Sequence, residues 1–135
     1  MPTKQHNILD RLVDEGITEV LVGYRSYRLN IKRGLREASE KCYGSADFDK
    51  GIISLEKDMD HETARETLVH ELTHIVLELC GLGGNEDTGI VEPHTNEEIT
   101  TLISRGWLTL INLNPKLFNI INENPKELRS ISETS

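Results

Sequence analysis

The run from His61 to Cys80 most constrains the fold of this chain, because it is the longest stretch that one uninterrupted helix can occupy. Asp60 precedes it as an expected N-cap residue, and the glycine-rich segment 81–84 ends it. At 100° per residue, one side of this helix is apolar and consists of Leu68, Leu72, Ile75, Val76 and Leu79. The opposite side carries Thr67, His70, His74 and Glu78 within a narrow arc. The pattern therefore predicts a long helix with one core face and one polar face.

Shorter elements surround this helix in the sequence. Helices are expected at His6–Glu15, Leu35–Lys41 and Asn96–Asn112, and strands at Glu19–Val22, Tyr27–Lys32 and Ile52–Glu56. Apolar and polar residues alternate from Tyr27 to Lys32, which is typical of a half-buried strand. The Asn-Pro pairs at 114–115 and 124–125 each predict the start of another short helix. The predicted fold class is α+β.

Length and charge limit the organisation and the partners. The 135 residues predict one domain over 1–128 and a flexible tail over 129–135. The net charge of -8 argues against nucleic acid and membrane as partners, because both are bound by clustered Lys and Arg. The first residues lack the apolar region of a secretion signal, so we expect a cytoplasmic protein with both cysteines reduced.

The polar face carries the sequence His70-Glu71-Leu72-Thr73-His74. Residues four apart lie one turn above each other, so both imidazoles point the same way and could bind one Zn²⁺. Glu71 is rotated by about 100° from His70, so it flanks the metal without binding it. A carboxylate in this position could deprotonate the water that the metal activates. The competing interpretation is a solvated helix face that happens to carry two histidines.

A catalytic zinc site needs a third protein ligand and an open position for water. The next helix offers Glu98, Glu97 and His94. Glu98 lies nearer than Glu97 to the apolar side of its helix and is the favoured third metal ligand. Thr95 and Glu98 also match a capping box, in which Glu98 would only bind the backbone of its own helix.

Two segments carry a resemblance to a known family. They are YGSADFDKGIISLEKDMDHETARETLVHELTHIVLE, which contains Arg65-Glu66-Thr67-Leu68 before His70, and NEEITTLISRGWLTLINLNP. Together they resemble the small gluzincin-type metallopeptidases of the ImmA/IrrE kind, especially short phage- or prophage-encoded members, over about residues 43–118. The family often follows its ligand Glu with Ala-Asn, whereas this chain has Ile99-Thr100. The resemblance implies a zincin-like domain, in which a small sheet packs on the His-Glu helix and a Glu-bearing helix follows.

The implied function is that of a zinc-dependent metallo-endopeptidase acting on a protein or peptide substrate. His70, His74 and Glu98 would bind Zn²⁺, and Glu71 would act as the general base. The strand 51–56 could pair with an extended substrate, and His94 and Tyr43 are candidates to stabilise the oxyanion. The alternatives are a zinc-containing binding or structural protein without turnover and a zinc hydrolase acting on non-peptide amides.

Overall fold

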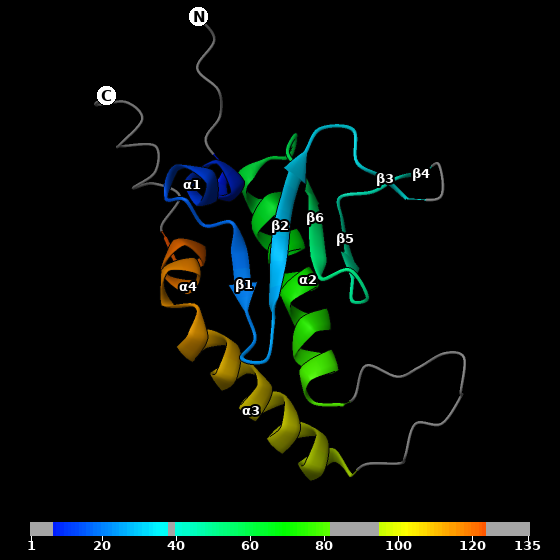
Figure 1. Ribbon diagram of the computed structural model, residues 1–135, viewed down its shortest axis with the longest axis vertical. Coiled ribbons are helices and arrows are strands. Elements are labelled where there is room, and N and C mark those ends of the chain that lie inside the picture. Colours follow the sequence, from blue (N-terminus) through cyan, green and yellow to red (C-terminus); the bar gives the residue numbers. More distant parts are fainter. Residues whose placement is uncertain (1–6, 38–39, 82–94, 124–135) are drawn as a thin grey trace, which may run out of the picture.

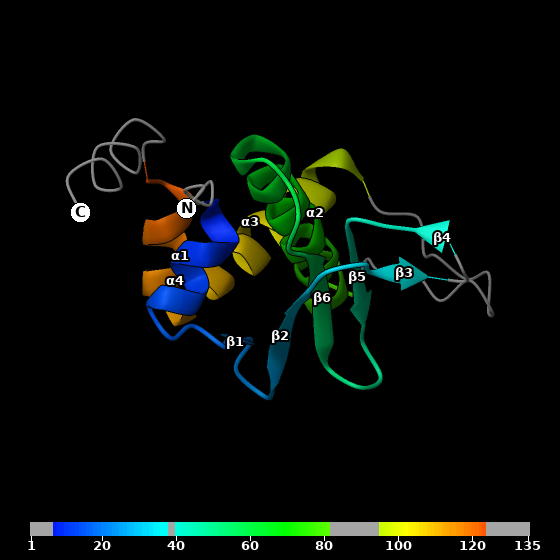
Figure 2. The same cartoon turned by 90° about the horizontal axis from the view of Figure 1, so that it is seen from above.

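A four-stranded sheet forms one layer of the protein, and helices cover one of its faces (Figures 1 and 2). The computed structural model describes residues 7–37, 40–81 and 95–123. The strand order is β1-β2-β6-β5, with bounds β1 Glu19–Leu21, β2 Ser26–Lys32, β6 Ile52–Glu56 and β5 Gly44–Asp47. Strands β2 and β6 are parallel, and the two outer pairs are antiparallel. The predicted α+β class is confirmed for the described residues.

The described residues form four helices, α1 Ile8–Asp14, α2 His61–Leu79, α3 Asn96–Leu113 and α4 Pro115–Ile121. Helix α2 lies behind the sheet, α1 and α4 lie side by side near β1, and α3 extends beyond the C-terminal end of α2 (Figure 1). The core between these layers includes Tyr27, Ile53, Leu55, Leu68, Leu72, Ile75, Val76 and Leu110. None of the described helices is long and apolar enough to cross a membrane.

Strand β2 shows why the described helices cover only one face of the sheet. Tyr27 is buried and Leu29 is partly buried, whereas Arg28 and Asn30 between and after them are exposed. Successive side chains in a strand point to opposite faces, so the exposed polar side chains lie on the face opposite the described helices. The predicted half-buried strand is confirmed.

The expected helix over Leu35–Lys41 is wrong. Residues Arg36–Glu37 form β3 and Glu40–Lys41 form β4, a short antiparallel pair separate from the main sheet. A distant carboxylate fixes the start of this segment, because Glu56 accepts hydrogen bonds from the amides of Gly34 at 2.9 Å and Leu35 at 3.1 Å. The same carboxylate accepts a third bond from the amide of Asp58 at 3.0 Å, and Glu56 is buried.

The prediction that the strand 51–56 pairs with a substrate is also wrong. Strand β6 is an inner strand, bonded to β2 along one side and to β5 along the other. Its backbone groups are therefore used within the sheet. The strand with an outward edge beside α2 is β5, which pairs with β6 alone among the described strands.

The other edge of the sheet is closed by a side chain. Asn114, at the junction of α3 and α4, accepts a hydrogen bond from the Leu21 amide at 2.8 Å and donates one to the Leu21 carbonyl at 2.7 Å. The amide group thus replaces a neighbouring strand residue at the end of β1. Helix α4 begins at Pro115, as the Asn-Pro pair predicted, but the side chain of Asn114 does not cap it.

Candidate metal centre

Helix α2 brings the predicted site residues together because it is regular from end to end. Asp60 caps it by accepting a hydrogen bond from the Thr63 amide at 2.7 Å. This bond and the one from the Thr63 hydroxyl lower the pKa of Asp60 below its usual value. The helix buries Leu68 and Leu72 against the sheet, which turns the His70 side outward. The expected bounds, 61–80, agree with the observed helix and its C-cap at Cys80.

The two histidines form a close pair on the exposed face. Their Nε2 atoms lie 3.2 Å apart, and the ring planes are inclined at 76°. At this 3.2 Å separation, both Nε2 atoms could bind one shared Zn²⁺. The type and spacing of these two donors therefore fit two of the ligand positions of a zinc site. The same distance also fits a hydrogen bond between the two imidazoles.

Glu71 has a different environment from its histidine neighbours. Its side chain is only 5% exposed, whereas His70 and His74 are exposed. It lies against the first residue of the edge strand, because a Cβ atom at Gly44 would be 3.2 Å from both Cγ and Oε1 of Glu71. Gly44 was not among the site residues predicted from the sequence. In the sequence, Gly44 is only a glycine in the segment that precedes the histidine motif.

A pocket beside the pair connects these residues. Tyr43, Gly44, His70 and Glu71 all contribute to its walls, together with three residues of the first half of α2. Tyr43 is exposed and precedes β5 directly. The structure thus brings together one candidate metal ligand, the candidate base and one of the two candidate oxyanion donors. His94, the other candidate donor, lies outside the described residues.

The structure does not bring Glu98 to the histidine pair. Glu98 is exposed in the first turn of α3, where its carboxylate accepts a hydrogen bond from the Thr95 hydroxyl at 3.0 Å. The Glu98 amide donates to the same hydroxyl at 3.1 Å, so this residue takes part in the cap that competed with the ligand role. Glu97 is exposed in the same turn.

The packing of α2 and α3 explains this separation. The Cys80 thiol donates to the Leu102 carbonyl at 2.9 Å, so Leu102 is level with the end of α2. His74 lies six residues before Cys80, and Glu98 lies one turn before Leu102. At 1.5 Å per residue, these two offsets together separate His74 from Glu98 by roughly 15 Å along the helix axes. Within the described part of the chain, no group of three His, Cys, Asp or Glu side chains is placed to hold a metal. Glu98 as third ligand stays a prediction.

We compared the chain with known proteins in three ways. A scan against protein-family models, a search of the curated proteins and a search of the solved structures each found no match. The resemblance to the ImmA/IrrE metallopeptidases therefore rests on the motif residues alone.

Proposed function

We propose that this chain is a zinc-dependent peptide hydrolase with a zincin-like domain. One observation carries the proposal: the Nε2 atoms of His70 and His74 lie 3.2 Å apart, and the buried carboxylate of Glu71 lines the pocket that adjoins them. Two adjacent imidazoles supply ligands that zinc prefers, and the carboxylate beside them supplies a base. An ordinary solvated helix face explains the exposed histidines but not a glutamate enclosed between the helix and an edge strand.

In this proposal His70 and His74 bind the metal. Zinc, when bound, would polarise the scissile carbonyl and lower the pKa of a water molecule. Glu71 would accept a proton from that water and deliver it to the leaving amine, as a general base and then a general acid. The Tyr43 hydroxyl would donate a hydrogen bond to the carbonyl oxygen as negative charge develops on it.

The substrate would bind along the edge of the sheet next to α2. Strand β5 occupies this edge, and its first residue, Gly44, approaches Glu71. An extended peptide could add to β5 by backbone hydrogen bonds, which would hold its carbonyl groups beside Glu71 with little dependence on sequence.

A zinc titration followed by thermal unfolding tests the proposal. The parent protein should bind about one equivalent of zinc and gain stability, by about 2.7 kcal/mol at a free zinc concentration of 100 times Kd. His74→Ala should lose this gain, whereas Glu71→Gln should keep it. Hydrolysis of a peptide mixture should fall by roughly 10²–10⁴-fold in Glu71→Gln, the usual range for a positioned base. Loss of zinc from both variants alike would contradict the role assigned to Glu71.

The third ligand needs its own test because the structure places Glu98 at a helix cap. A capping glutamate tolerates Gln, which still accepts a backbone hydrogen bond, whereas a zinc ligand requires the anionic oxygen. We therefore expect Glu98→Gln to weaken zinc binding more than Glu97→Gln or His94→Ala in competition with a chelator. Normal binding in all three variants would exclude this segment as a source of the third ligand.

Peptide hydrolysis by the parent and by Glu71→Gln separates the second candidate function from the first. The absence of a third ligand beside the pair, within the described residues, favours a zinc-binding protein without turnover. That protein would take up zinc through His70 and His74, and its hydrolysis of peptides would be the same in the parent and in Glu71→Gln.

A further inference from the structure

The pocket beside His70 is large enough to receive a side chain of a substrate. Its volume is about 390 Å³, within the usual range for small-molecule sites. The lining residues are Tyr43, Gly44, Thr63, Glu66, Thr67, His70 and Glu71. Five of these seven belong to α2, so the pocket extends from His70 toward the N-terminal end of that helix.

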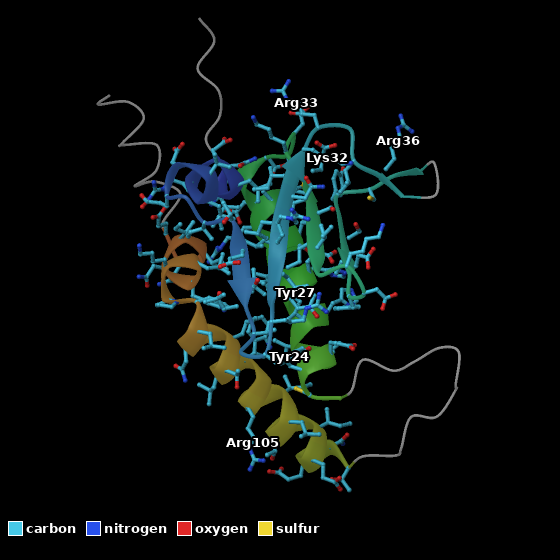
Figure 3. All side chains as sticks on the ribbon, viewed as in Figure 1. Tyr24, Tyr27, Lys32, Arg33, Arg36 and Arg105 are labelled. Atoms are coloured by element: carbon cyan, nitrogen blue, oxygen red, sulfur yellow. The ribbon has the colours of Figure 1, made fainter. Side chains whose placement is uncertain are left out.

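Carboxylates dominate the charge of this pocket. Glu71 is buried within it, and Glu66 is exposed, one helical turn before His70. No Lys or Arg lines the pocket, and no ion pair among the described residues involves Glu66. The basic side chains of Lys32, Arg33 and Arg36 lie elsewhere, around the end of β2 and the start of β3 (Figure 3).

The walls suit a long side chain that ends in a cation. Tyr43, Thr63 and Thr67 line the pocket together with Gly44, and residues of these types can contact an aliphatic stem. Two glutamates and no basic side chain line the pocket, and the whole chain has a net charge of -8. Both features favour a positively charged occupant over a neutral one.

We propose that this pocket receives a lysine or arginine side chain next to the cleaved bond, and that Glu66 selects it. This inference rests on the proposed hydrolase function and narrows its substrates to basic peptides. Glu66 is the selecting group because its charge is not required for proton transfer, whereas Glu71 has that role. Its position four residues before His70 places it on the same side of α2 as the histidine pair.

Helix α2 provides a matched control for the selecting residue. Glu78 follows His74 by four residues, as Glu66 precedes His70 by four, and both glutamates are exposed. Glu78 does not line the pocket. A general effect of negative charge on a cationic substrate would act through both glutamates, whereas recognition in the pocket would act through Glu66 alone.

The first experiment compares zinc-loaded protein on paired peptides that differ only in lysine or norleucine beside the cleaved bond. The parent should prefer lysine by about tenfold or more in kcat/KM, the size of discrimination that one good pocket contact provides. Glu66→Gln should reduce this ratio to about one, Glu66→Lys should reverse it, and Glu78→Gln should keep it. Cleavage with equal rates for both peptides in the parent would overturn the proposal.

The second experiment does not require turnover. Nα-acetyl-lysine hydroxamate and Nα-acetyl-norleucine hydroxamate share a zinc-binding group. Such small molecules can bind with the side chain on either side of the metal, so they can reach the pocket whichever side it lies on. We expect calorimetry on the zinc-loaded parent to show tighter binding of the lysine compound, and the difference to vanish in Glu66→Gln. This preference in a protein that cleaves no peptide would support the pocket while refuting the hydrolase. Equal affinities, or no binding of either compound, would overturn the proposal.

Discussion

Replacing Gly44 by alanine should disturb the contact between the edge strand and α2. The new Cβ atom would lie 2.9 Å from Cγ2 of Thr67 and 3.2 Å from Cγ of Glu71. Carbon atoms in good contact are about 3.5–4.0 Å apart, so these two gaps are too short by at least about 0.6 Å and 0.3 Å. Either β5 must move outward or both side chains of α2 must leave their rotamers.

The expected cost of Gly44→Ala is about 1–3 kcal/mol, the usual range for one extra carbon in a packed interior. For a chain of this size, each kcal/mol lowers Tm by roughly 4 °C. Urea unfolding followed by circular dichroism measures the free energy directly. Zinc affinity should stay near that of the parent, because the new methyl group contacts Thr67 and Glu71 rather than the two imidazoles.

Two further variants make this prediction specific. Thr67→Ser removes the Cγ2 methyl, so Gly44→Ala should cost less in that background, with a coupling of at least about 0.5 kcal/mol. Ser45→Ala changes the next residue of β5, which points to the other face, and should stay within about 0.5 kcal/mol of the parent. If Gly44→Ala were as stable as the parent, the close approach of β5 to Glu71 would be refuted.

Three other substitutions test contacts that hold the fold. Glu56→Ala leaves three backbone amides without their acceptor and should destabilise the protein by about 2–5 kcal/mol in urea unfolding. Asn114→Ala removes both bonds to Leu21 and should cost about 1–3 kcal/mol, with faster hydrogen exchange at the Leu21 amide. Arg11, 2.8 Å from Glu123, lowers the pKa of that carboxyl below its ordinary value of 4.5. The pair therefore stabilises the fold above about pH 4.5 and loses this effect as the pH falls through the lowered pKa. Glu123→Gln should cost up to about 1 kcal/mol at pH 7 and progressively less as the pH falls through the lowered pKa, as followed by thermal unfolding.

The sequence predicted the elements whose signals are local. The apolar spacing and the Asp60 cap defined α2, and the alternation after Tyr27 defined β2. Both signals come from residues close together in the chain, and tertiary packing reinforced them. The pairing of His70 with His74 was predictable for the same reason, because helix geometry alone brings residues four apart together.

The features that the sequence did not reveal depend on distant contacts. The segment after Leu35 was expected to be helical, but the Glu56 carboxylate, 21 positions away, binds its first amides. The inner position of β6 depends on strand order, which the pattern within a strand does not encode. The burial of Glu71 depends on Gly44 in another element. The distance of Glu98 from the pair depends on where α3 crosses α2, which is a property of packing.

The bond between Asn114 and Leu21 joins residues 93 positions apart, and this has a consequence for how the chain is made. Synthesis proceeds from the N-terminus, so β1 leaves the ribosome long before the side chain that closes its outer edge. Until α3 and the residues after it have emerged, the outer NH and C=O of Leu21 lack this partner. An open strand edge can pair with another chain. The nascent protein is therefore most exposed to wrong pairing during the interval between the synthesis of these two residues.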